Sequence, residues 1–139
     1  MKKILLASLV FAIAASAGAQ DYPTKAINLI VPNPPGGMNQ IHAQPLGAII
    51  EKLYKQPAPV LNKPGATAAA GTGFVANAAP DGYNMVMGHA GPFVSAVTLY
   101  GKDLPYDPVK DFEPVSMIAT GITVLVTHPA LPVSSAGEL

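Results

Sequence analysis

Short apolar runs alternate with glycine- and proline-rich turns along most of the chain. The runs are brief and mostly aliphatic or β-branched, a pattern typical of buried strands in a parallel sheet. Each is followed by Gly or Pro, which end strands and form turns. We therefore expect one strand in each of the first three runs and one or two strands in the last: 25–32, 58–65, 83–88 and 116–129.

Helical periodicity separates the first two of these runs. Apolar residues repeat at i, i+3, i+4 and i+7, as on the buried face of an amphipathic helix: Leu46, Ile49, Ile50 and Leu53. Pro45 interrupts the pattern because proline in a helix interior removes a hydrogen bond and clashes with the preceding turn. The helix is predicted either to begin near Ala43 or to be kinked there.

Two further segments favour helices. Residues 66–79 are alanine-rich, although Gly71 and Gly73 weaken the helical tendency, and residues 93–100 suit a short helix. The resulting order, strand, helix, strand, helix, strand, predicts an α/β fold with a parallel-rich sheet and flanking helices.

The first residues are typical of a secretory signal peptide. Lys2 and Lys3 precede an uncharged apolar stretch that ends on the small residues Ala17 and Ala19. The alternative, a transmembrane anchor, is disfavoured because the apolar part is shorter than the roughly 20 residues that a bilayer requires. We expect a cleaved signal over residues 1–19 and export of the remaining chain to the periplasm.

Charge and cysteine content exclude several functions. Without Lys2 and Lys3, six lysines face eight acidic residues, and the chain has no arginine. Nucleic acid is therefore an unsuitable partner, because phosphate binding needs clustered cations. The absence of cysteine excludes thiol catalysis and thiolate metal sites.

Candidate binding residues lie where the predicted strands end. In open α/β sheets, ligands bind at the loops that follow the carboxyl ends of the strands. The three loops at 33–40, 62–71 and 88–92 are rich in Gly or Pro and poor in charge. Glycine lets a ligand approach the backbone, and helix N-termini supply N–H donors, so these loops could hold an anion without arginine. The alternative is that they are plain turns.

Motifs of other chemistries are weak or absent. Residues 71–76 (GTGFVA) match a dinucleotide fingerprint in form, but the preceding strand ends too far upstream. His42, His89 and His128 are isolated, so no metal site is expected, although His89 falls inside a candidate loop. Asp107 and Asp111 flank a proline and suit turns rather than catalysis. No cofactor is expected, and a small secreted hydrolase remains only a minor alternative.

Several colinear stretches resemble one family. From about residue 21 to the last residue, the chain is similar to the substrate-binding receptors of tripartite tricarboxylate transporters, the Bug family. The resemblance rests on five stretches: DYPTKAINLIVPNPPGG, NKPGA, AAPDGYNMVMG, LPYDPVKDFEPVSMIAT and VLVTHPALPV.

The resemblance implies a non-enzymatic, monomeric periplasmic binding protein of type II. Such a receptor binds a small carboxylate and delivers it to the membrane subunits of its transporter. We expect an incomplete first lobe over 20–120 and a crossover strand with the start of a second lobe over 121–139, so that the fold is truncated before that lobe. The residues expected nearest the ligand are Pro34, Pro35, Gly36, Gly37, Asn39, Gly65, Ala66, Thr67, His89 and Ala90.

The chain also departs from the family pattern at these loops. Asn39 and Gln40 replace a hydroxyl residue and an acid, and Thr67 and Ala68 replace two glycines. A side chain at a position that needs positive φ costs about 1 kcal/mol. These departures keep a second hypothesis open, in which the chain is a remnant of such a receptor that no longer binds.

Overall fold

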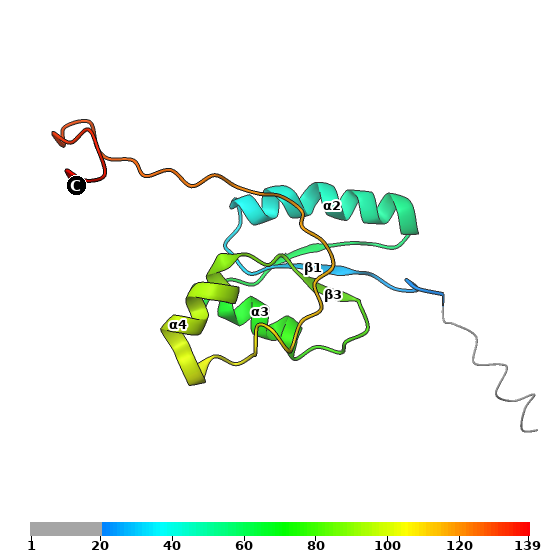
Figure 1. Cartoon of the computed structure of the whole chain (residues 1–139). Helices are drawn as coiled ribbons and strands as arrows, with labels where there is room; N and C mark the ends of the chain where they lie inside the picture. Colours follow the sequence, from blue (N-terminus) through cyan, green and yellow to red (C-terminus); the bar gives the residue numbers. More distant parts are fainter. Residues whose placement is uncertain (1–20) are drawn as a thin grey trace, which may run out of the picture.

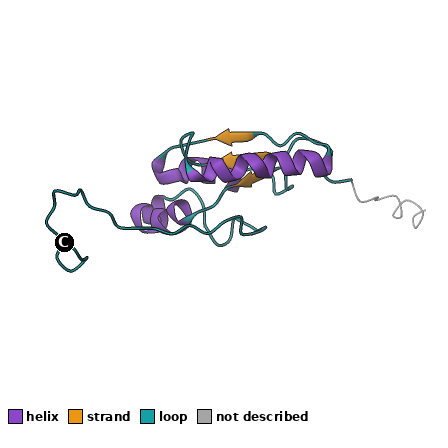
Figure 2. Ribbon diagram, turned by 90° about the horizontal axis from the view of Figure 1, so that it is seen from above, coloured by secondary structure: helices purple, strands orange, loops and turns teal. Residues whose placement is uncertain are grey.

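The computed structural model describes residues 21–139 and contains a three-stranded parallel sheet. The strands β1 (Asn28–Val31), β2 (Val60–Asn62) and β3 (Asn84–Val86) stand in the order β2-β1-β3. Figure 2 shows them pointing in one direction. The predicted α/β class, with a parallel sheet and flanking helices, is confirmed. The predicted signal peptide lies outside the described residues.

The central strand supplies most of the buried core. Leu29, Ile30 and Val31 are almost fully buried, because β1 has a strand on either side and a helix over each face. On one face, Leu29 packs with Ile27, Ile50 and Ala58 in the main apolar cluster. Side chains alternate along a strand, so Ile30 lies on the opposite face.

Two helices cover the two faces of the sheet (Figure 1). Helix α2 (Met38–Tyr54) packs on β1 and β2, whereas α3 (Ala69–Ala76) packs on β1 and β3. A short helical turn, η1 (Ala66–Ala68), leads into α3. After β3, the π-helical turn η2 (Gly91–Ser95) continues into α4 (Ala96–Tyr100) and the 3₁₀ turn η3 (Gly101–Asp103).

Helix α2 begins earlier than the first of the two alternatives predicted from the sequence. It starts at Met38 rather than near Ala43 and includes Pro45. Pro45 lies on an exposed side of the helix, where water can hydrate the carbonyl oxygen of Ile41 that a proline leaves without an N–H donor. A solvent-facing proline therefore lies within the helix instead of ending it.

The expected strands over 116–129 are not formed. Residues 114–139 contain no helix or strand, and Ile122 is 95% exposed. In Figure 1 this segment, which we call the C-terminal arm, extends away from the body. A strand needs a neighbour that accepts and donates its backbone hydrogen bonds, and no residue of the arm pairs with β1, β2 or β3. The lobe boundaries assigned from the sequence stay predictions.

The glycines of the GTGFVA stretch have a packing role. Gly71 and Gly73 lie inside α3, not in a loop between strand and helix, as a dinucleotide site would require. A Cβ on Gly71 would come within 2.5 Å of the Lys63 carbonyl oxygen, so this glycine allows close helix packing. Within residues 21–139, no helix is both long and apolar enough to cross a membrane.

Candidate functional site

The three glycine- and proline-rich loops meet at one edge of the sheet. Because the strands are parallel, their carboxyl ends lie together, and each loop leaves from that edge. Two open hollows lie there, with volumes of about 550 and 270 Å³. Asn33, Pro34 and His89 line both hollows, so these two cavities form one continuous region of the surface.

The first loop joins β1 to α2 and is held by asparagine side chains. The Nδ2 of Asn39 donates to the Oδ1 of Asn33 at 2.7 Å, and the Nδ2 of Asn62 donates to the carbonyl oxygen of Asn33 at 3.0 Å. These bonds fix the loop against its own helix and against β2. Asn33 therefore orders the edge of the sheet, although it was not among the site residues predicted from the sequence.

Gly37 is the N-terminal cap of α2 and has no side-chain capping bond. The first N–H groups of a helix lack intrahelical acceptors and carry partial positive charge, so they favour an anion. One nearby donor is already used, because the N–H of Gly36 donates to the Oε1 of Gln40 at 2.7 Å. Gln40 is one of the residues at which the chain departs from the family pattern.

The second loop adopts an unusual left-handed turn. Gly65, Ala66, Thr67 and Ala68 all have positive φ, with values of 134°, 46°, 54° and 71°. Residues other than glycine are strained in this region. Thr67 and Ala68, which replace two glycines of the family pattern, therefore both lie at positions with positive φ. The Thr67 hydroxyl lies 3.3 Å from the hydroxyl of Tyr100, a distance at which the two share a hydrogen bond.

The third loop places His89 between the other two. Its Nδ1 accepts a hydrogen bond from the N–H of Gly91 at 3.0 Å. Burial lowers the pKa of His89 below its usual value, because a partly desolvated ring disfavours the charged form. The buried hydroxyl of Tyr106 donates to the carbonyl oxygen of Pro92 at 2.7 Å, which anchors the helical turn that follows.

No lysine, aspartate or glutamate lines either hollow among residues 21–139. Lys63 is near the second loop in sequence, but its ammonium group stacks on the ring of Phe74 at 4.1 Å. The electrostatics of the edge therefore come from backbone dipoles, amide side chains and one imidazole. Such a surface suits a small anion recognised by N–H donors.

The structure brings most of the predicted site residues together. Pro34, Pro35, Gly36, Gly37, Asn39 and His89 line the larger hollow, and Gly65, Ala66 and Thr67 line the smaller one. Ala90 is exposed and lines neither of these hollows. The larger hollow adds Asn33 and Met38, and the smaller one adds Pro32, Pro64, Ala68 and Gly91. Of these, Asn33 had a sequence signal, since it directly follows the first strand and its proline.

Side chains discounted at the sequence level have structural roles. The Oδ1 of Asp107 accepts hydrogen bonds from the N–H groups of Val109 and Lys110, and the N–H of Asp107 donates to Asp111. The prediction that these acids form a turn is confirmed. Among residues 21–139, no three His, Asp or Glu side chains are grouped in a way that could hold a metal ion.

Comparison with known sequences identifies the family of this chain. Residues 43–139 match the sequence model of one protein family, described as tripartite tricarboxylate transporter family receptor. Protein BugT of Bordetella pertussis is 35% identical over 127 residues, covering 91% of this chain and 39% of BugT. The chain thus spans about two fifths of the length of the curated relatives that it matches.

Solved structures agree with this assignment. MatC from Rhodopseudomonas palustris, which contains bound malate, has a TM-score of 0.65 and 36% identity. The match covers 70% of this chain and 33% of MatC. The periplasmic binding protein BugD has a TM-score of 0.61 and 38% identity, over 67% of this chain and 30% of BugD. The chain therefore belongs to the tripartite tricarboxylate transporter receptor family, whose structurally known relatives are solute-binding proteins.

Proposed function

We propose that this chain binds a small organic carboxylate at the carboxyl edge of its sheet, as part of a periplasmic solute receptor. One observation supports this most strongly. Three loops rich in glycine and proline, the N-terminus of α2 and the ring of His89 surround the two hollows. Among residues 21–139, no Lys, Asp or Glu side chain lines either hollow. Carboxylates are well matched to such N–H donors.

The ligand is proposed to be anionic and small. The larger hollow, at about 550 Å³, is within the usual size range of small-molecule sites. MatC binds malate, and the family name refers to tricarboxylates, so dicarboxylates and tricarboxylates are the first candidates. The proposed role of the chain is that of a receptor and not of an enzyme.

The partners follow from the same proposal. A monomeric receptor would carry its solute through the periplasm to the membrane subunits of a tripartite transporter. These assignments rest on the family to which the chain belongs, because the chain spans only part of its relatives. The ten residues predicted from the sequence remain the proposed ligand contacts, with Ala90 the least supported by position.

A second candidate is a chain that keeps the loops of the family without binding a solute. The contact between the N–H of Gly36 and Gln40 favours it, because one donor of the first loop is already occupied. Ala66, Thr67 and Ala68 favour it as well, since each has a positive φ that glycine would adopt without strain.

Calorimetric titration separates the two candidates. Acetate, malate and citrate, which carry one, two and three carboxylates, should be titrated into the purified chain at neutral pH. The proposed function predicts saturable heat with malate or citrate and a matching rise in the melting temperature. If none of the three produces heat or a thermal shift, the chain is a non-binding member of the family.

A further inference from the structure

His89 has one ring nitrogen that is used within the protein and one that is not. The Nδ1 accepts a hydrogen bond from the N–H of Gly91, so it carries no proton. In a neutral imidazole the other nitrogen then carries the hydrogen. The Nε2 of His89 is therefore an N–H donor, and its tautomer is fixed by the backbone two residues further along the chain.

This donor is buried and has no partner. In the part of the chain that the structure describes, the Nε2 of His89 is the buried side-chain nitrogen or oxygen atom left without a hydrogen bond. Buried polar groups in folded proteins are almost always paired with protein, water or ligand. The ring lines both hollows, so a solute held between the first and second loops would lie next to the ring, and a small shift of the loops that cover the Nε2 would bring a solute oxygen to it.

Two neighbouring polar side chains already have partners within the protein. The Nδ2 of Asn39 donates to Asn33, and the Thr67 hydroxyl lies within hydrogen-bond distance of Tyr100. His89 differs from them because its donor has no such internal partner among residues 21–139. No Lys, Asp or Glu side chain from the first or second loop lines the hollows beside the ring. Among the lining residues, no carboxylate is therefore available to accept this N–H in place of a solute.

We propose that His89 binds the solute directly, by donating its Nε2–H to a carboxylate oxygen while its Nδ1 stays unprotonated. The inference rests on the proposed function and adds to it the atom, the tautomer and the protonation state. Protonation of Nδ1 would place a hydrogen against the N–H of Gly91 and break that contact. The lowered pKa of His89 agrees with a neutral ring, since burial opposes the charge.

His128 offers a matched control within the same chain. Its Nδ1 accepts a hydrogen bond from the N–H of Ala130 at 3.1 Å, which repeats the local geometry of His89. However, His128 is exposed on the C-terminal arm and lines neither hollow. The two histidines therefore share a backbone contact and differ in whether a solute can reach the ring.

Malate titrations of four proteins test the proposal. His89→Ala should bind at least about tenfold more weakly than wild type, because a hydrogen bond to a charged group is lost. His89→Gln keeps an N–H donor near the position of Nε2 and should bind more tightly than His89→Ala. His128→Ala should bind as wild type does. Circular dichroism checks that each variant is folded.

Nitrogen NMR of the wild-type chain gives a second readout. In the free protein at pH 8, the Nδ1 of His89 should show the signal of an unprotonated nitrogen. Saturating malate should shift the Nε2 signal and raise the pKa of His89, because a nearby anion favours the charged ring. The signals of His128 should not move.

The outcomes distinguish this proposal from the proposed function. If wild type binds malate or citrate but His89→Ala binds within twofold of it, the role of His89 is overturned and the proposed function stands. A protonated Nδ1 in the free protein also overturns that role. If wild type binds no carboxylate, the proposed function fails and the inference fails with it.

Discussion

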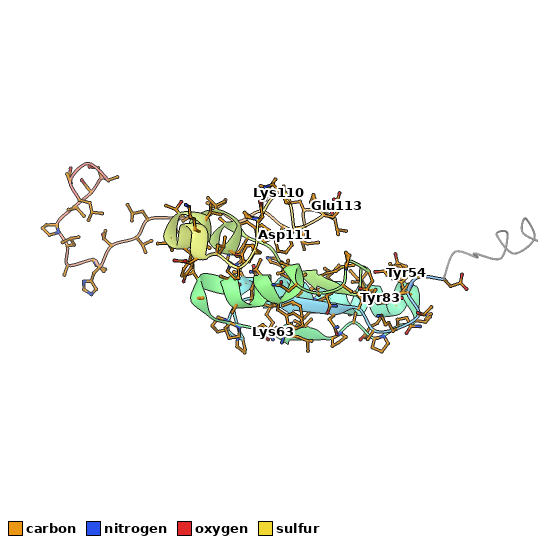
Figure 3. All side chains as sticks on the ribbon, turned by 90° about the horizontal axis from the view of Figure 1, so that it is seen from below. Tyr54, Lys63, Tyr83, Lys110, Asp111 and Glu113 are labelled. Carbon is orange, nitrogen blue, oxygen red and sulfur yellow. The ribbon has the colours of Figure 1, made fainter. Side chains whose placement is uncertain are left out.

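At the amino end of the sheet, side chains link the segments before β1 and β3, whereas at the carboxyl end three loops surround two hollows. The hydroxyl of Tyr22 donates to the carbonyl oxygen of Gly82 at 2.7 Å, and the N–H of Thr24 donates to the hydroxyl of Tyr83 at 2.9 Å. Lys25 forms an ion pair with Asp81 at 3.1 Å and lies over the ring of Tyr83. Figure 3 shows Tyr83 at the end of the body where residue 21 enters.

The difference separates stability from binding within one small sheet. The segments before β1 and β3 are linked by aromatic, ionic and hydrogen-bonded contacts. The carboxyl end has two hollows, a helix N-terminus and an imidazole with an unused donor. We infer that the amino end stabilises the fold and that the carboxyl end holds the solute.

Gly71→Ala should have the largest effect, because it damages the support beneath the carboxyl end. The new Cβ would lie 2.5 Å from the Lys63 carbonyl oxygen and 2.9 Å from the Cα of Pro32, and backbone atoms cannot move aside easily. Overpacking of this kind should lower the free energy of unfolding by about 3 kcal/mol. Urea denaturation measures it.

Gly121→Ala is the control, because a Cβ added at Gly121, on the C-terminal arm, would meet nothing within 4 Å. Its free energy of unfolding should stay within about 0.5 kcal/mol of the wild-type value. A Gly121→Ala loss comparable with that of Gly71→Ala would show that the arm packs on the body.

Gln40→Ala should strengthen binding at the carboxyl end. It releases the N–H of Gly36 from the side chain that now occupies it. One exposed hydrogen bond is worth about 1 kcal/mol, so the affinity for malate should rise by up to about fivefold. Gln44→Ala, one turn further along α2, should leave the affinity unchanged. Weaker binding by Gln40→Ala would instead make Gln40 a ligand contact.

Tyr83→Phe should weaken the amino end without affecting the site. It removes the hydroxyl that accepts the N–H of Thr24 and should lower the free energy of unfolding by about 1 kcal/mol. Tyr54→Phe, at the same end of the body, is the control and should change stability little. Malate affinity should be that of wild type in both variants. A loss of affinity without a loss of stability would contradict the separation of the two ends.

Ala66→Gly should relieve strain in the second loop. Ala66 is exposed and has a φ of 46°, so glycine removes a steric cost and loses little packing. The free energy of unfolding should rise by up to about 1 kcal/mol. Ala70→Gly, in the right-handed helix α3, should lower it by a similar amount. If thermal denaturation shows that both variants change stability in the same direction, strain at Ala66 is excluded as the cause.

The smallest expected effect is a pH dependence at the amino end. The N–H of Tyr83, and then Lys25, hold the pKa of Asp81 below its usual value of 3.8. The stabilising contribution should therefore be present above pH 3.8 and be lost as the pH falls through the lowered pKa of the folded state. Asp81→Asn should differ from wild type in thermal stability at pH 7 and should match it at acid pH. A difference that persists at acid pH would rule out ionisation of Asp81 as its source.

Local sequence patterns predicted the elements that depend on local physics. The apolar run that contains Leu29 and Ile30 marks the central strand because burial on both faces requires such a run. The meeting of three loops at one edge followed from the parallel order alone. The motif residues Pro34 to Gly37 line a hollow in the structure, and their contact with a ligand stays a prediction.

Other features depended on partners distant in sequence. The run around Ile122 has the composition of a strand but lies beside no other strand, and composition cannot reveal that. The sequence left the start of α2 open, because Met38, Asn39 and Gln40 carry no apolar periodicity. The pattern also could not show that the Gln40 side chain accepts a hydrogen bond from the N–H of Gly36, or that the Nε2 of His89 is unpaired. Both features depend on side-chain positions.

One NMR titration tests the central claim most directly. Malate should be added to ¹⁵N-labelled protein while the backbone amide signals are followed residue by residue. Binding at the carboxyl end predicts shifts at Gly37, Met38 and Ala66, and unchanged signals at Thr24, Gly82 and Tyr83, at the amino end. Shifts centred on the amino end, or no shifts at saturating malate and citrate, would contradict it.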